Sequence, residues 1–454
     1  MMNHVIYGYF GSEDKPTLNP GDGVKVTLLN LLGSDGYLGH GIGNVVDDLA
    51  KLGVFPSQIG IELLVLAAHV QAADTRISRS TGSEDSWTRK ISVVVPVTSD
   101  VNRWERVSTI LTRALDFLTG DLWDIRFRAS SYNEALVKEQ APLETQTFDS
   151  ISLFSGGLDS LIGAIDLLEQ KENTLFVSHA SDGATSAAQY ELFDGLKEQY
   201  ENLNIERIRL WMSFPKNLVE DSQPEMTMRS RSFLFFALGV AAGTGLEHKF
   251  KLFVPENGLI ALNVPLDPLR MGSHSTHTTH PFYMARWNEL LVELGIDGEL
   301  TNPYWDKTKG EMVGACANKQ LLSDLISTSL SCSSPSKGRW SGKSSEHCGY
   351  CVPCIIRRAA IKASSLNDNT PYSLDNLQGQ SLNTLVAEGK QIRSFQFALS
   401  RLQAKPELAK YLIYNAGPLL DLSSTTKYGL SDVYTRGLLE VSKLLEGVET
   451  KPIE

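Results

Sequence analysis

Two adjacent glycines stand between a short hydrophobic strand and an apolar helical segment, and this feature constrains the fold most strongly. The strand is expected at 151–154, the loop 155–160 reads SGGLDS, and the helix continues over 161–169. Glycines let the backbone approach an anion closely, and the free N–H groups at the start of a helix favour a phosphate. The segment therefore predicts a loop that binds phosphate or pyrophosphate at the end of a strand.

Strand and helix signals alternate through the residues after this loop. β-rich runs at 174–178, 205–210 and 251–255 are interspersed with helical segments, of which 229–242 is a long and apolar one. Parallel strands need long crossover connections, which are usually helices. The rhythm therefore predicts an α/β fold with a doubly wound parallel sheet.

The pattern divides the chain into three domains and a linker. Residues 1–130 predict an N-terminal α/β accessory domain with no catalytic constellation, and the polar stretch 131–147 is interpreted as a linker. The central domain covers 148–370. Residues 371–454 carry apolar stripes without strong strand signals and predict a C-terminal helical region.

Composition narrows the function classes. The 454 residues contain 42 Lys and Arg against 53 Asp and Glu, and the resulting net charge of −11 weighs against sequence-independent coating of nucleic acid. No apolar run reaches the ~18 residues of a membrane span, and the N-terminus lacks a signal-peptide pattern. We therefore expect a soluble cytoplasmic protein with no membrane contact.

Four of the five cysteines crowd together near residue 340. Cys332, Cys348, Cys351 and Cys354 follow the spacing C-x15-C-x2-C-x2-C, whereas Cys316 stands apart as an expected core residue. Four thiolates suit a tetrahedral Zn²⁺ site, so the cluster predicts a zinc knuckle. An iron–sulfur cluster uses similar spacings and remains an alternative at this stage.

The glycine loop matches neither the Walker loop nor the G-x-G-x-x-G of dinucleotide folds. It resembles the SGGxDS loop of the ATP pyrophosphatase (PP-loop) superfamily, whose members have an adenine-nucleotide α-hydrolase (HUP-like) fold. Those enzymes split ATP between its α and β phosphates and adenylate a substrate oxygen.

Further motifs resemble one branch of that superfamily, the 7-cyano-7-deazaguanine synthase (QueC-like) family. A basic stretch at 228–234, the segments 302–305 and 308–311, and the cysteine segment 331–357 follow the family's order over about 148–365. The family's second-strand and substrate loops are replaced, here by 178–183 and by 255–258 with 272–280. About 147 residues precede the matched block and about 90 follow it. The chain is therefore similar to the enlarged QueC-like proteins of anti-phage defence operons, such as the Qat system.

The resemblance implies a C–N ligase that adenylates 7-carboxy-7-deazaguanine, or a similar deazapurine carboxylate, with ATP and Mg²⁺. Ammonia then forms an amide, and the altered loops favour a protein amine from the same operon as an alternative acceptor. The residues assigned to pyrophosphate are Phe154, Ser155, Gly156, Gly157, Leu158, Asp159 and Ser160. The residues assigned to catalysis are Asp159, Lys309, Arg229 and Arg231, and Lys307 is a rival of Lys309. The residues assigned to the substrate are Glu256, Asn257, His274 and His277.

Three other interpretations remain open. His274, His277 and His280 could form a metal site, although their spacing aligns them only on a helix and the intervening residues favour a loop. The protein could be a PP-loop enzyme that thiolates tRNA, which the net charge disfavours. It could also be a non-catalytic nucleotide-binding subunit of a defence complex.

Overall fold

A computed structural model describes the chain over residues 3–17, 23–83, 85–143, 146–179, 182–220, 222–225, 227–268, 277–333, 335 and 346–453. Its strands form two larger sheets, in which every pairing is parallel, and a small pair of two-residue strands. The prediction of a mixed α/β protein with parallel strands is confirmed.

The N-terminal sheet has the strand order β2-β1-β3-β4. Its strands are β1 (Asn3–Tyr9), β2 (Val24–Asn30), β3 (Lys90–Val97) and β4 (Leu122–Ala129). The helices of this part are α1 (Ile42–Lys51), α2 (Gln58–Arg76), α3 (Arg79–Gly82) and α4 (Val101–Thr119). Local sequence explains both long helices: Ser57 caps α2 by accepting from the Gly60 N–H at 3.2 Å, and Gly120 ends α4 with a φ of +70°.

The central sheet has the order β7-β6-β5-β8-β9. Its strands are β5 (Ser150–Leu153), β6 (Thr174–His179), β7 (Glu206–Leu210), β8 (Phe250–Phe253) and β9 (Gly298–Thr301). Its helices are α5 (Leu158–Glu169), α6 (Gly183–Gln199), α7 (Arg231–Gly243), α8 (Gly258–Leu262), α9 (Pro281–Leu294), α10 (Lys309–Ala315), α11 (Lys319–Leu325) and α12 (Val352–Ser364). Every residue of β5 and β6 is buried, as expected for strands covered on both faces.

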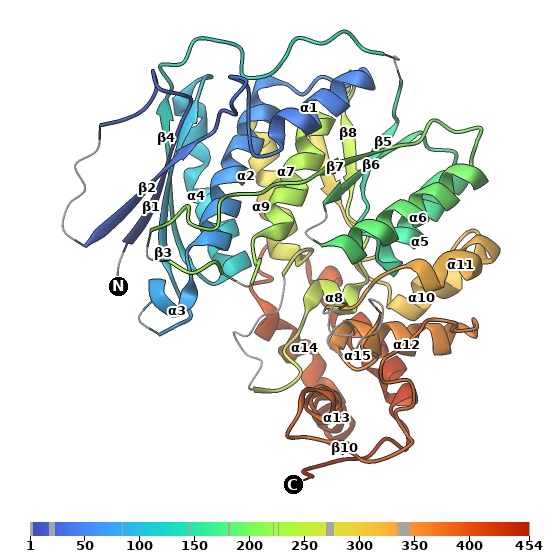
Figure 1. The fold of residues 1–454 in the computed structure, drawn as a ribbon. Coiled ribbons are helices and arrows are strands. Elements are labelled where there is room, and N and C mark those ends of the chain that lie inside the picture. Colours follow the sequence, from blue (N-terminus) through green and yellow to red (C-terminus); the bar gives the residue numbers. More distant parts are fainter. Residues whose placement is uncertain are drawn as a thin grey trace.

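The layers stack from one sheet to the other (Figure 1). Helices α2 and α4 cover the N-terminal sheet and pack on α7 and α9, which in turn contact the central sheet. One continuous hydrophobic core therefore runs from Ile6 to Leu300 through both parts. At the contact between α2 and α7, Gly60 lies so close to Ala241 and Thr244 that a side chain there would clash.

The C-terminal part is helical and has its own core. Its main elements are α13 (Ala387–Ala404), α14 (Ala409–Leu412) and α15 (Ser424–Leu444), with the short strands β10 (Leu382–Asn383) and β11 (Thr450–Lys451). This second core also takes in α8 and α12, so the C-terminal helices pack directly on the central part of the chain. Across the described ranges, no helix combines the length and the apolar character that a membrane crossing requires.

Candidate functional site

The predicted phosphate loop lies at the carboxyl edge of the central sheet. Strand β5 runs into the loop, its neighbour β8 runs into Glu256 and Asn257, and β9 leads on to Lys309. The strand order changes direction between β5 and β8, because β6 and β7 lie on one side of β5 while β8 and β9 lie on the other. In open parallel sheets, ligands bind in the crevice at such a switch point.

The backbone of the loop needs glycine at one position. Gly156 has a φ of +82°, and a side chain there would come within 3.0 Å of Gln189 Cγ. Gln189 also closes the loop from α6, since its amide donates to the Ser155 and His179 carbonyl oxygens at 3.2 Å each. Ser155 Oγ donates to Ser160 Oγ at 3.2 Å, so the two predicted phosphate-facing hydroxyls lie together.

Asp159 joins the loop to the segments that follow β8 and β9. Its carboxylate lies 3.2 Å from Lys309 Nζ, and its other oxygen accepts from the Asn257 N–H at 3.2 Å and amide at 2.8 Å. Lys309 is only 5% exposed, whereas Lys307 is 51% exposed and lies 3.9 Å from Asp306. Of the two rival lysines, the geometry brings Lys309 to the loop.

Glu256 adds a second carboxyl group beside this pair. Thr279 donates a hydrogen bond to Glu256 Oε2, and the Asn302 amide donates to the Glu256 carbonyl at 2.7 Å. Burial raises the pKa of Glu256 to about 7; the charge of Asp159 acts in the same direction, whereas Thr279 and Lys309 oppose it. At neutral pH, Glu256 is therefore poised between its protonated and ionised forms.

The C-terminal helix α15 holds the start of α10, which carries Lys309. Thr308 forms a capping box with Glu311, and the Thr308 hydroxyl also donates to Glu440 of α15. The Gly310 N–H donates to Glu440 Oε2 at 3.2 Å, and Arg436 pairs with Glu311. Lys309 is thus fixed by residues more than 120 positions away in the sequence.

The two predicted arginines have different surroundings. Arg231 opens α7 and donates to the His179 carbonyl oxygen at 3.2 Å, the same oxygen that accepts from Gln189. Arg231 is therefore connected to the loop only through two intervening residues, His179 and Gln189. Burial lowers its pKa, while Asp182 opposes this effect.

Arg229 instead contacts the N-terminal part. Its guanidinium lies 4.1 Å from the centroid of the Trp87 ring and donates to the Thr119 carbonyl oxygen at 2.8 Å. The next N–H, of Ser230, donates to Asp74 Oδ2 at 2.8 Å. The structure therefore does not bring Arg229 to the loop, because the N-terminal part of the chain supplies its partners.

The histidines that are described lie just before α9. His277 and His280 pack on Phe117 of α4, with ring centroids 4.6 and 4.9 Å away, and the Phe282 N–H donates to His280 Nδ1 at 3.2 Å. Burial lowers their pKa values to about 4 and about 3, so both rings are neutral at physiological pH. Their connection to Glu256 is indirect: Thr279, which lies between them in the sequence, donates a hydrogen bond to Glu256. His274 lies outside the described residues.

The four clustered cysteines converge on one point. All four Sγ atoms lie within 4.8 Å of one another, including the pairs Cys332–Cys351 at 4.0 Å and Cys348–Cys354 at 3.9 Å. Zinc–sulfur bonds of about 2.3 Å give sulfur–sulfur edges of about 3.8 Å in a tetrahedron, so the group fits one Zn²⁺ ion. A cluster of several irons would separate the sulfurs further.

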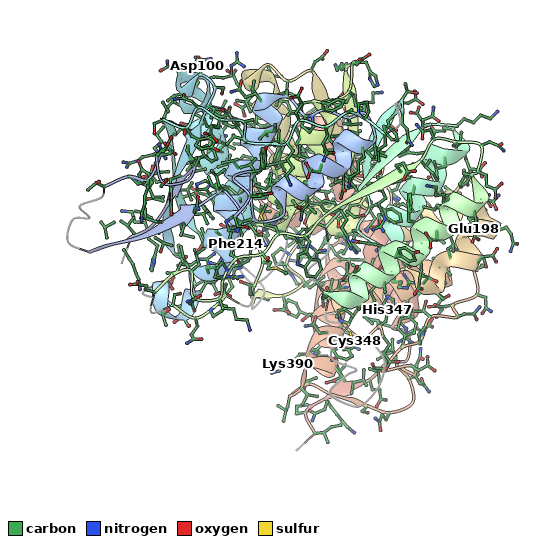
Figure 2. All side chains as sticks on the ribbon, turned by 45° about the horizontal axis from the view of Figure 1, so that its top comes forward. Asp100, Glu198, Phe214, His347, Cys348 and Lys390 are labelled. Atoms are coloured by element: carbon green, nitrogen blue, oxygen red, sulfur yellow. The ribbon has the colours of Figure 1, made fainter. Side chains whose placement is uncertain are left out.

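The cysteine segment also forms hydrogen bonds with the predicted phosphate loop, residues 155–160. The Leu330 N–H donates to the Gly156 carbonyl oxygen at 2.7 Å, and the Leu158 N–H donates to Ser331 Oγ at 3.2 Å. Ser331 is held in turn, because its own N–H donates to His347 Nε2 at 3.1 Å. His347 and Cys348 lie where the C-terminal part of the ribbon meets the central part (Figure 2).

Sequence reasoning missed Ser331, His347, Gln189 and Glu440. Ser331 and His347 flank the cysteine ligands, and that proximity was the one available signal. Gln189 and Glu440 lie on helices with no motif around them, so no sequence pattern marks them.

Comparisons with known proteins assign no family. No protein family matches the chain, and no curated protein matches it. Among solved structures, the chain matches a ketoreductase domain from the bacillaene assembly line with 10% identity and a TM-score of 0.21, over 71% of this chain and 85% of that one. A likeness of this size carries no argument about fold or function.

Proposed function

We propose that the chain is an ATP-dependent C–N ligase with a doubly wound PP-loop fold, similar to the 7-cyano-7-deazaguanine synthase family. One observation carries the proposal: Asp159, Lys309, Glu256 and Asn257 converge beside the SGGLDS loop at the switch point of a parallel sheet. A glycine loop before a helix can bind phosphate, a buried lysine can neutralise its charge, and a carboxylate can hold Mg²⁺. The single-ion geometry of the cysteines weighs against a thiolase with an iron–sulfur cluster.

The substrate carboxylate would attack the α-phosphorus of ATP, with pyrophosphate as the leaving group and an acyl-adenylate as the product. The Ser155–Ser160 loop would bind the departing pyrophosphate through its N–H and hydroxyl groups. Lys309 would neutralise charge on the phosphates, a role that suits a cation held in a buried site. An amine would then attack the acyl carbon, releasing AMP and one proton from nitrogen.

Two groups would assist when the ligands are bound. Asp159 is the carboxylate that would hold Mg²⁺, which neutralises charge on the bound triphosphate. Glu256, with a pKa of about 7, is suited to accept the proton that the amine loses. The acceptor would be ammonia or an amine group of a protein that is encoded in the same anti-phage operon.

The test is turnover of the full-length, zinc-loaded protein with Mg-ATP, 7-carboxy-7-deazaguanine and ammonium. Pyrophosphate release is followed continuously, and products are identified by mass spectrometry. We expect an amide or nitrile product in the wild type and in Lys307→Met, and a loss of at least 100-fold in Lys309→Met. Lys307 is the matched control because it is exposed and lies two residues from Lys309.

Pyrophosphate release without either small product would keep the adenylation step and point to another acceptor. Intact masses of the co-expressed operon proteins would then reveal a deazaguanine adduct. Binding of ATP without pyrophosphate release, with every operon protein present, would overturn the proposal in favour of a non-catalytic nucleotide-binding subunit.

A further inference from the structure

The cysteine site and the predicted phosphate loop (residues 155–160) are connected by hydrogen bonds of Leu330 and Ser331, the two residues before the first clustered cysteine. Leu330 and Ser331 each hydrogen-bond the loop, at 2.7 Å to Gly156 and at 3.2 Å to Leu158. Cys332 follows directly, so one of the four clustered cysteines is the next residue after Ser331, which holds the loop.

A second connection runs back from the cysteine knuckle. His347 precedes Cys348, and its Nε2 accepts from the Ser331 N–H at 3.1 Å. The Ser373 N–H donates to the His347 carbonyl oxygen at 2.8 Å, and the ring packs against Tyr372 with centroids 5.8 Å apart. His347 is therefore held in place by Tyr372 and Ser373.

A third connection comes from α12, which begins within the knuckle. Arg357, three residues after Cys354, is fully buried and donates to Ser329 Oγ at 2.7 Å. The same guanidinium donates to the Ile326 carbonyl oxygen at 2.5 Å and to Thr370 Oγ1 at 3.0 Å. Arg357 therefore ties Ile326 and Ser329, just before the residues that contact the loop, to the helix that carries Cys354.

The contact at Leu158 matters because of where that N–H lies. Leu158 is the first residue of α5, and the first N–H groups of a helix have no partner within the helix. Ser331 Oγ supplies that partner from 173 positions away. By accepting this hydrogen bond, the hydroxyl holds the first residue of α5 in place.

We propose that Ser331 is a positioning residue that couples the metal site to the phosphate loop. Metal binding at the four cysteines fixes residues 329–331, and these residues hold Gly156 and Leu158 in the conformation that receives phosphate. Loss of the metal would free this segment and loosen the loop. The consequence for nucleotide binding rests on the function proposed above, whereas the coupling itself does not.

Hydrogen–deuterium exchange of the full-length protein tests the coupling without any substrate. We expect extraction of the metal with a chelator to speed exchange in peptides covering 155–160 by at least tenfold. Peptides from β3 serve as the internal control. We expect Ser331→Ala to speed loop exchange at least fivefold while one metal ion per chain is retained. The matched control Ser333→Ala, an exposed serine on the other side of Cys332, should change neither quantity.

Unchanged loop exchange in both the metal-free protein and Ser331→Ala would overturn the proposal. If metal extraction also speeds exchange in β3, the whole chain has loosened, and the metal-loaded Ser331→Ala protein decides alone. Calorimetric titration with Mg-ATP provides the second readout, with at least tenfold weaker binding expected for Ser331→Ala than for Ser333→Ala. Coupled exchange in a wild type that binds no ATP would sustain this inference and refute the proposed function instead.

Discussion

Replacing Lys309 by methionine is expected to destabilise the protein by about 3 kcal/mol, because it leaves a buried carboxylate without its cation. Methionine keeps most of the volume of the side chain, so the change isolates the charge. The Lys309 and Asp159 side chains are 5% and 11% exposed and lie 3.2 Å apart. Removing one partner of such a pair costs about 3–5 kcal/mol, and we take the lower end since Asn257 still donates twice to Asp159.

A double-mutant cycle with Asp159→Asn separates the pair from the individual side chains. The doubly neutral variant no longer buries an unpaired charge, so we expect a coupling energy of about 2 kcal/mol between the two sites. The assay is urea unfolding with linear extrapolation, at constant pH and with the metal bound. Lys307→Met is the control, with an expected change below about 0.5 kcal/mol because surface lysines contribute little.

Two results would refute this reasoning. A Lys309→Met protein as stable as Lys307→Met would mean that the buried ion pair does not form in solution. A large loss in Lys309→Met with a coupling energy below about 0.5 kcal/mol would mean that Lys309 stabilises through packing and not through Asp159.

Three further predictions concern the same region. Since burial raises the pKa of Glu256 to about 7, the folded state binds its proton more tightly than the unfolded chain does. Stability should therefore fall as pH rises from about 4.5 to 7, and Glu256→Gln should be more stable than wild type by about 3 kcal/mol at pH 8 but not at pH 4.5, measured by urea unfolding. Gly156→Ala should cost about 1–2 kcal/mol, given its φ of +82° and the nearness of Gln189, whereas Gly183→Ala, with open space around it, should cost nothing in the same assay. Elemental analysis should find one zinc per chain in the wild type and less than a tenth of that in Cys354→Ser, and iron–sulfur absorbance would contradict this.

Local sequence patterns are enough to predict elements that begin or end at a residue type with a strong capping preference. Serine is a favoured N-cap residue and glycine a favoured helix end, and Ser57 does cap α2 while Gly120 ends α4. Strands β1 and β9 were not anticipated. In β1 the polar His4 occupies a buried position and breaks the alternation, and β9 has four residues of which only Leu300 is buried. Their place in a sheet is decided by the neighbouring strands, which periodicity does not reveal.

The candidate site divides in the same way. The glycine loop and the four cysteines are short-range patterns, and the structure draws each of them together. The contact between Leu158 and Ser331 spans 173 positions, so no local spacing could predict it. Arg229 or Arg231 was expected to neutralise phosphate charge, by analogy with a family whose resemblance to this chain begins only near residue 148. In this chain the N-terminal part provides Trp87 and the Thr119 carbonyl oxygen, which hold the Arg229 guanidinium elsewhere.

The candidate site extends beyond the part of the chain that resembles the QueC-like family. The resemblance stops near residue 365, yet Glu440 accepts hydrogen bonds from both Thr308 and Gly310, on either side of Lys309. Without α15, the first turn of α10 would lose these contacts, and Lys309 would reach Asp159 from a helix that is free to fray. Catalysis by charge placement depends on groups that are fixed before the ligand arrives. The C-terminal helices therefore contribute to the site by fixing its cation, and their removal should not be neutral for any activity that uses Lys309.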